Sequence, residues 1–338
     1  MHFGTFHIMG KPEGLTDHQV ISETLREIRH AERLNFHTAW LTEHHASSFG
    51  ICTSPSVMAA AAAVQTQKIR IGYGVNVTPL HHPVRLAEEI AMVDQLSKGR
   101  VVAGFGPGYS PYEFDAYGLD IDERHTRHAE TLSIVQKAWT NKTFDHQGKI
   151  YHLHHVTTLP RPKQTPHPPI AVAANSLDSV AEVARAGNRL LLLVKTATLP
   201  DLMQHYQKIA TASGLCDDFI QQTLSHTGVL RNVCLANTHD LAYQTAYKAT
   251  TWLMKLRNKL AQETPSPALL EEQVKTYLSE RAIIGTPEEV IEQINTLQQT
   301  GIGEVICWFR WGTMSHQQIL TAMTLFAKRV MPVFQPSN

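Results

Sequence analysis

The stretch IRIGYGVNVTPLHHPVRLAEEIAMVDQLSKGRVVAGFG, residues 69–106, decides the fold class. It predicts a strand over 69–77, a helix over 83–96 and a second strand over 101–106. Pro83 suits the first position of that helix, where a backbone N–H is not needed. Strands that alternate with helices in this order lie parallel in one sheet. A chain that repeats this unit therefore belongs to the α/β class.

The same alternation extends in both directions along the chain. Thr16 and Gln19 have the spacing of a capping box and predict the start of a helix. Six further strands are predicted, over residues 2–9, 38–42, 170–174, 190–194, 229–236 and 304–309. Eight parallel strands fit either an open doubly wound sheet or a closed barrel. The count favours the barrel, so we expect a (β/α)8 TIM barrel with insertions, as a single domain over residues 1–338.

One polar segment interrupts the alternation. Residues 143–155 are rich in histidine, and five prolines follow between Pro160 and Pro169. Such a proline run is typical of a surface connection, because proline cannot donate the backbone hydrogen bonds of a sheet or a helix interior. We therefore expect an inserted hairpin and loop over residues 143–169.

The composition is that of a soluble globular protein. The chain has 338 residues, of which 43% are hydrophobic and 18% charged, and 30 basic side chains balance 30 acidic ones. Without a net positive charge, nucleic acid is not an expected partner. The four cysteines form no Cys-x-x-Cys pair, the N-terminus lacks an apolar signal segment, and the uncharged stretch 46–67 is broken by polar residues and Pro55. We expect a cytoplasmic protein that does not enter a membrane.

Histidine is unusually frequent, with 20 residues. Its side chain binds metals and transfers protons near neutral pH. Neither His125 with His128 nor the group His152, His154 and His155 has the spacing of a recognised metal-ligand set. We therefore expect no metal site and assign these side chains to the surface.

The carboxyl ends of barrel strands form the active face. Glu43, His44 and His45 follow the predicted strand 38–42 and so reach that face. One histidine there suits acid/base chemistry, while its neighbour on the alternate side would face the wall. An arrangement in which both are merely hydrogen-bonded loop residues is equally consistent with the sequence.

Further strand ends are candidates for binding a ligand. Asn175 and Ser176 open a helix whose first turn contains Ser179, which suits either a phosphate or an ordinary N-cap. Gly74 and Gly106 allow the backbone to approach a planar ring closely, although barrel packing also requires small residues. The glycines after residue 101 lack the spacing of a dinucleotide fingerprint.

Four motifs in this chain resemble the bacterial luciferase-like monooxygenases. They are WLTEHH at 40–45, HPVRLAEE at 82–89, DQLSKGR at 94–100 and GTPEE at 285–289. The resemblance runs from Phe3 to about Pro332 and points to the luciferase alpha subunit and its relatives. It implies a TIM-type barrel that binds FMN in its reduced form, FMNH2, and adds dioxygen (O2) at the flavin C4a position. The resulting C4a-peroxyflavin would oxygenate a small organic substrate.

The resemblance also assigns roles to residues and partners. His44 matches the catalytic histidine of the family, and Gly74-Val75 matches a non-proline cis peptide bond under the flavin. The implied cofactor contacts are Phe6, Gly74, Val75, Gly106, Tyr109, Ala174, Asn175, Ser176 and Ser179, with Asn175, Ser176 and Ser179 at phosphate-binding positions. A separate flavin reductase would supply FMNH2, and a homodimer would form through the early helices.

The chain departs from luciferase in three places. Gly106 and Pro107 stand where luciferase has a cysteine and a phosphate-binding arginine, and Lys195 is one candidate to replace that cation. Asn175 replaces a carboxylate, which removes negative charge near the phosphate. The segment 260–284 is shorter than the mobile active-site loop of luciferase. We expect this segment to be the mobile part of the active site, and its length argues against light emission.

Two alternative functions share this barrel. A deazaflavin (F420) oxidoreductase would transfer hydride without oxygen. A non-catalytic flavin-binding or partner subunit would explain the missing arginine, although His44 argues against it. The loops that select a substrate are where the resemblance is weakest, so the sequence leaves the substrate open.

Overall fold

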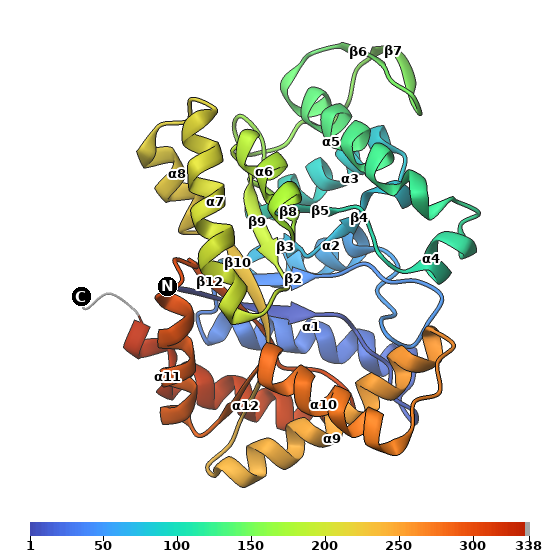
Figure 1. The fold of residues 1–338 in the computed structure, drawn as a ribbon. Helices are drawn as coiled ribbons and strands as arrows, with labels where there is room; N and C mark the ends of the chain where they lie inside the picture. The colour runs from blue at the N-terminus through green and yellow to red at the C-terminus, as the bar shows by residue number, and fades with distance from the viewer. Residues whose placement is uncertain (335–338) are drawn as a thin grey trace.

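Eight parallel strands close into a barrel in the computed structural model, which describes residues 1–334 (Figure 1). The wall consists of β1 (His2–His7), β2 (Thr38–Leu41), β3 (Arg70–Tyr73) continued by β4 (Asn76–Val77), β5 (Val101–Gly106), β8 (Ile170–Ala173), β9 (Arg189–Leu192), β10 (Gly228–Leu235) and β12 (Glu304–Trp308). The ring closes because β9 pairs with β10 and β12 pairs with β1. The predicted barrel is thus confirmed, and the open doubly wound sheet is excluded. Residues 335–338, at the end of the predicted domain, lie outside the described residues.

Helices surround the barrel (Figure 1). They are α1 (Asp17–Arg33), α2 (Pro55–Gln65), α3 (Pro83–Leu96), α4 (Pro111–Ala116), α5 (Arg124–Thr140), α6 (Leu177–Arg185), α7 (Leu199–Ala212), α8 (Asp217–Leu224), α9 (His239–Leu260), α10 (Pro267–Arg281), α11 (Pro287–Gln298) and α12 (His316–Arg329). The capping box at the start of α1 forms as predicted, with the Thr16 hydroxyl accepting from the Gln19 N–H. No helix within residues 1–334 combines the length and apolarity that crossing a membrane requires.

One predicted strand is divided in the structure, one strand was not predicted, and six others differ from their predicted bounds by one or two residues. The predicted strand 69–77 is divided into β3 and β4, because the peptide bond between Gly74 and Val75 is cis. A short strand that the sequence pattern did not reveal, β11 (Ala282–Gly285), pairs in parallel with β10 outside the barrel wall. Together with α10 it occupies most of the segment 260–284, whose mobility stays a prediction.

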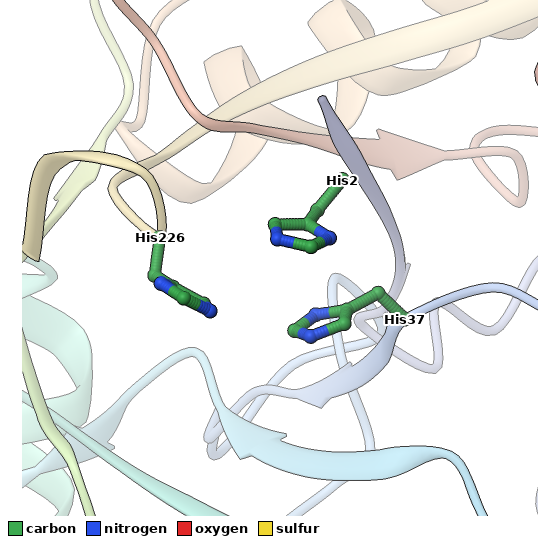
Figure 2. Close-up of side chains that lie close together, drawn as sticks. All are labelled: His2, His37 and His226. Carbon is green, nitrogen blue, oxygen red and sulfur yellow. The ribbon is translucent and has the colours of Figure 1, made fainter. Parts of the chain in front are cut away.

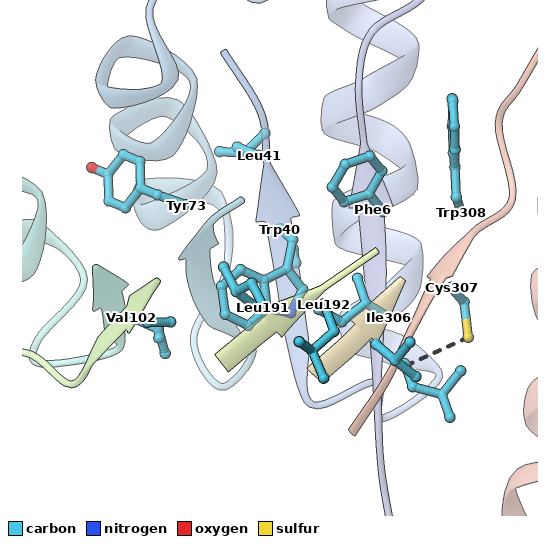
Figure 3. Close-up of a cluster of buried hydrophobic side chains, with 14 of the residues drawn as sticks. Phe6, Trp40, Leu41, Tyr73, Val102, Leu191, Leu192, Ile306, Cys307 and Trp308 are labelled. Carbon is cyan, nitrogen blue, oxygen red and sulfur yellow. Dashed lines mark hydrogen bonds between the residues drawn. The ribbon is translucent and has the colours of Figure 1, made fainter. Parts of the chain in front are cut away.

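The barrel interior is filled by large side chains from several strands, shown with their neighbours in Figure 3. Trp40 is buried, and its indole N–H donates to the Glu304 carboxylate at 3.2 Å. A Cβ atom at Gly72 would overlap that indole, so glycine is required on the neighbouring strand. Gly104 is constrained in the same way by the carbonyl of Tyr73. The glycines near the centre of the barrel are therefore explained by packing.

The segment 143–169 contains an antiparallel hairpin of β6 (Phe144–Gln147) and β7 (His152–Val156), which lies beside α5 (Figure 1). Glu130 on α5 holds its turn, because this carboxylate accepts the backbone N–H groups of Lys149, Ile150 and Tyr151 at 2.7 to 3.1 Å. These bonds satisfy donors that a tight turn would otherwise leave to water.

Candidate active site

A cavity of about 270 Å³ opens at the carboxyl ends of the wall strands. Its lining is mainly apolar and includes the aromatic side chains Phe6, Trp40, Phe49, Tyr109 and Trp308. Polar groups come from few positions, among them His44, Glu113 and Asn175. An apolar pocket with a small number of placed polar groups is the usual form of a small-molecule site.

His44 is the histidine that faces this cavity. Its Nδ1 lies 2.9 Å from the Glu113 carboxylate, and both side chains are buried. The same Glu113 oxygen accepts the backbone N–H of His45 at 3.0 Å. Because Nδ1 donates to Glu113, Nε2 is left to hold or accept a proton at the cavity wall. The ring is further packed by the edges of Phe49 and Tyr109.

Glu43 is the centre of a second buried network behind His44. Its carboxylate lies 2.9 Å from His45 Nε2 and 2.8 Å from His81 Nε2, and it accepts the Val77 N–H at 2.6 Å. Burial favours the neutral acid, but the hydrogen bonds from both histidines outweigh it and hold the pKa of Glu43 below its usual range. Burial likewise opposes the charged form of His81, yet its bond to Glu43 raises the pKa of this imidazole. A stable ion pair therefore braces the cavity wall.

His45 faces the wall, on the opposite side of the chain from His44. With its proton on Nε2 it donates to Glu43, and its Nδ1 accepts from the Tyr117 hydroxyl at 3.0 Å. This arrangement satisfies both ring nitrogens within the protein. His45 is accordingly a structural neighbour of the cavity, and His44 alone of the pair reaches it.

The cis peptide bond between Gly74 and Val75 forms part of the cavity floor. The Val75 side chain stands over Gly106, where an added Cβ atom would lie 2.7 Å from the Val75 Cγ2. A side chain at residue 106 would therefore push Val75 into the cavity. Thr42 also lines the floor, and its buried hydroxyl has no hydrogen-bond partner within residues 1–334.

Asn175, Ser176 and Ser179 lie together at the start of α6. Asn175 lines the cavity, and its side-chain oxygen accepts the Leu193 N–H at 2.7 Å. Ser176 and Ser179 form a reciprocal capping box, as expected for an ordinary N-cap. Ser176 is exposed and Ser179 is half-buried, so the same helix start is accessible to an anion. Both interpretations of this helix start are compatible with the geometry.

The positively charged side chains near the start of α6 lie on elements other than β5. Lys195 forms an ion pair with Glu280 of α10. Arg281, also at the end of α10, donates to the Leu193 carbonyl at 3.0 Å, so Leu193 is held between Arg281 and Asn175. Burial, together with the nearby Arg281, lowers the pKa of Arg231 to about 10. The structure thus brings Arg281, which the sequence did not single out, to the region that Pro107 leaves without charge.

Six of the nine predicted cofactor positions line the cavity with His44, namely Phe6, Gly74, Val75, Gly106, Tyr109 and Asn175. Ala174 is buried in the core behind it, and Ser176 and Ser179 lie beside it. A cofactor contact at any of the nine stays a prediction. Glu113 was missed, because an acid after Pro111 in the first turn of a helix is usually a surface residue. The bond between His81 and Glu43 carried no sequence signal.

Residues 1–304 match the family model described as luciferase-like monooxygenase. An uncharacterised protein of Sinorhizobium fredii is 35% identical over 63% of this chain and 61% of its own length. The oxygenase component of the flavin-dependent trigonelline monooxygenase of Acinetobacter baylyi is 26% identical over 100% of this chain and 97% of its own length. The family match thus covers most of the chain.

Solved structures agree with this assignment. The monooxygenase RslO1 from Streptomyces bottropensis has a TM-score of 0.88 at 27% identity, covering 99% of this chain and 100% of its own. At lower identity the same fold occurs in an FMN complex of the 3,6-diketocamphane monooxygenase oxygenating constituent from Pseudomonas putida, with a TM-score of 0.80, 21% identity and 98% coverage of each chain. It also occurs in the coenzyme F420 dependent tetrahydromethanopterin reductase of Methanopyrus kandleri, with a TM-score of 0.78, 18% identity and 99% coverage of each chain. The chain belongs to the luciferase-like monooxygenases, a family of flavin-dependent enzymes.

Proposed function

We propose that this enzyme uses FMNH2 and O2 to oxygenate a small organic substrate. The observation that carries the proposal is His44, whose Nδ1 is fixed by Glu113 so that Nε2 faces an apolar cavity. Reduced FMN, when bound, supplies the electrons that activate dioxygen. His44 Nε2 then holds or moves the proton that oxygen transfer requires.

The remaining residues of the cavity suit the cofactor and its protection from water. Gly74, Val75 and Gly106 line the cavity where the flavin ring system would lie. Asn175, with the two serines of the α6 start, would hold the phosphate. The aromatic lining excludes water that would otherwise discharge the activated oxygen.

Substrate class follows from the same lining. Few polar groups face the cavity, so we infer a compact, largely apolar substrate with one or two polar atoms. The names of two relatives supply trigonelline and 3,6-diketocamphane for the first panel of substrates, one charged and one uncharged.

The partners of the enzyme are proposed on separate grounds. The oxygenase component of the trigonelline system supports a separate flavin reductase as the source of FMNH2. The early helices α2 and α3 expose Val57, Val64, Met92 and Leu96 at 44 to 68% of their surface, and this apolar face supports a homodimer. Four free cysteines support a reducing, cytoplasmic location.

The segment 260–284 would move over the cavity within a single barrel domain, since Leu260 and Ala261 lie against Tyr109 at its mouth.

Anaerobic titration of the protein with FMNH2, followed by mixing with oxygen and a substrate panel, tests the proposal. We expect saturable FMNH2 binding and incorporation of one oxygen atom into a product. His44→Ala should keep FMNH2 binding within about threefold and slow product formation by about 10² to 10⁴-fold. Ser176→Ala should instead weaken FMN binding while leaving the step after saturation unchanged. Product formation by His44→Ala at the wild-type rate would remove His44 from the mechanism.

Hydride transfer with F420 is the second candidate, because the same fold serves an F420 dependent reductase and because residue 107 is not a cation here. The same titration with reduced and oxidised F420 separates the two candidates. Tight F420 binding without binding of FMN in either redox state would replace the monooxygenase proposal. A protein that binds FMNH2 but oxygenates nothing, even with His44 intact, would instead be a flavin-binding partner subunit.

A further inference from the structure

Three histidines meet at the amino end of the barrel, opposite the cavity. His2 begins β1, His37 directly precedes β2, and His226 lies just before β10. One ring nitrogen of each lies within 4.8 Å of the others, and no other group of three metal-ligating side chains does so within residues 1–334. Figure 2 shows the three rings gathered in one space from three separate segments.

The hydrogen bonds of two of these rings leave the same nitrogen free. His226 Nδ1 lies 3.1 Å from the Gln222 carbonyl, which fixes the proton on that nitrogen. His37 Nδ1 lies 2.8 Å from the Thr38 hydroxyl. Nε2 is therefore the available nitrogen on both rings. A ring whose far nitrogen bonds a carbonyl or hydroxyl is the usual state of a metal-binding histidine, because that bond sets its tautomer and orientation.

The surroundings disfavour the charged form of His2 and His226. Burial, with the neighbouring His37 and His226, lowers the pKa of His2 to about 4, and burial also lowers the pKa of His226. Neutral imidazole is the form that binds a metal. Among the charged side chains of this end, Glu304 lies 3.9 Å from His37 Nδ1, while the Arg189 guanidinium lies near His226 and disfavours added positive charge. Glu304 would supply part of the counter-charge for a divalent ion, and it also lies near the guanidinium groups of Arg70 and Arg189.

The rings are now stacked, with centroids 4.2 Å apart for His2 and His37 and 5.0 Å for His2 and His226. Tetrahedral zinc needs Zn–N bonds of about 2.0–2.1 Å, so ligand nitrogens lie roughly 3.4 Å apart. To bind one ion, the rings would have to rotate about their side-chain bonds from this stacked arrangement until their nitrogens reach that spacing. His2 also borders a surface cavity of about 710 Å³, which gives an ion and its water a path to the cluster.

We propose that His2, His37 and His226 form a binding site for one Zn²⁺-like divalent transition-metal ion, with water as the fourth ligand. Three histidines and no thiolate favour zinc, or cobalt and nickel in its place. The site ties the start of β1 to the segments before β2 and β10. Because the amino face of such barrels contributes stability and not catalysis, the ion has a structural role.

Tag-free protein, freed of metal with a chelator, is the sample for the test, since an added histidine tag would itself bind the ion. Zn²⁺ titration by calorimetry should saturate at one ion per chain, and Co²⁺ should give the visible absorption of a four-coordinate site. His37→Gln and His226→Gln should each weaken Zn²⁺ binding by at least tenfold and abolish the Zn²⁺-dependent rise in melting temperature. His152→Gln with His154→Gln, on the exposed hairpin, is the matched control and should change neither.

A second variant separates metal binding from folding. Thr38→Val keeps the shape of a buried side chain and removes the hydrogen bond to His37 Nδ1, so Zn²⁺ affinity should fall about tenfold while the metal-free melting temperature changes little. Absence of one-site binding in the wild-type protein would overturn the proposal. So would binding that survives both His37→Gln and His226→Gln, or that is lost only in the hairpin control.

Discussion

Glu113 offers a direct test of how the buried carboxylates set up the candidate active site. One oxygen of Glu113 accepts hydrogen bonds from both His44 Nδ1 and the His45 backbone N–H. Glu113→Gln can keep both bonds, with the amide oxygen in that place, and so removes only the charge. A hydrogen bond to a charged group contributes about 1.5–3 kcal/mol and a neutral one about 0.5–1.5 kcal/mol. Replacing the charged acceptor with the neutral amide should raise the free-energy barrier of each step in which His44 is cationic by about 1 kcal/mol or slightly more. Each such step should therefore slow by about tenfold.

Glu113→Ala removes the acceptor as well. Two buried N–H groups lose their partner, at a cost of about 1–3 kcal/mol each, so the free energy of unfolding should fall by about 2 kcal/mol or more. The ring of His44 is then free to rotate, and product formation should fall by about 10² to 10⁴-fold. The rate of product formation should decrease from wild type to Glu113→Gln and again to Glu113→Ala.

Single-turnover mixing of the FMNH2-loaded enzyme with oxygen and a substrate measures these rates, and ¹⁵N NMR reports which nitrogen of His44 carries the proton. Glu288→Gln is the matched control, because Glu288 forms an exposed pair with Arg329 away from the cavity. FMNH2 affinity should stay near the wild-type value in all three variants. If Glu113→Ala turned over as fast as Glu113→Gln, or kept the proton of His44 on Nδ1 to the wild-type extent, Glu113 would not position His44.

Three further predictions address other parts of the site. Gly106→Ala should displace Val75 and weaken FMN binding by tenfold or more, measured by flavin fluorescence; unchanged affinity would place the ring elsewhere. Arg281→Met should weaken FMN binding by about tenfold but leave riboflavin binding unchanged, because only FMN carries the phosphate. The pair of Glu43 and His81 should stabilise the fold most between about pH 4.5 and 6.5, the ordinary pKa values of the two groups. The contribution of Glu43, whose pKa is lowered, is lost as pH falls below that window, and that of His81, whose pKa is raised, as pH rises above it. Urea unfolding of wild type and His81→Gln across pH measures this, and a difference independent of pH would refute it.

The alternation of strands and helices could be predicted from sequence because each period is local. The helix over 83–96 and the strand over 101–106 occur with the predicted bounds. The break of the strand 69–77 could not be predicted from periodicity, because the cis peptide bond before Val75 does not alter the pattern of side chains. β11 was missed because four residues beside a helix give too short a pattern.

The candidate site was predicted where one strand end carries its own signal and missed where distant segments meet. His44 follows a buried strand, which is enough to place it at the cavity. Glu113 comes from a helix 69 residues further along, and its partnership with His44 appears only when β2 and β5 are neighbours of β3 in the barrel. His2, His37 and His226 show the same limit, since their residue numbers share no ligand spacing although their rings are stacked.

The run Glu43-His44-His45 shows why consecutive residues at a strand end act together. Alternation along an extended chain sends neighbouring side chains to opposite faces. His44 therefore reaches the cavity and His45 does not, while Glu43, which also borders the cavity, bonds His45. Glu43 also accepts the Val77 N–H, two residues beyond the cis peptide bond that floors the cavity. One buried carboxylate thus holds both the strand that carries the proton-transferring histidine and the strand that carries the floor. Loss of Glu43 should consequently disturb the position of His44 and the flavin surface at once, whereas loss of Glu113 should disturb His44 and the His45 backbone but leave the bond between Glu43 and Val77 in place.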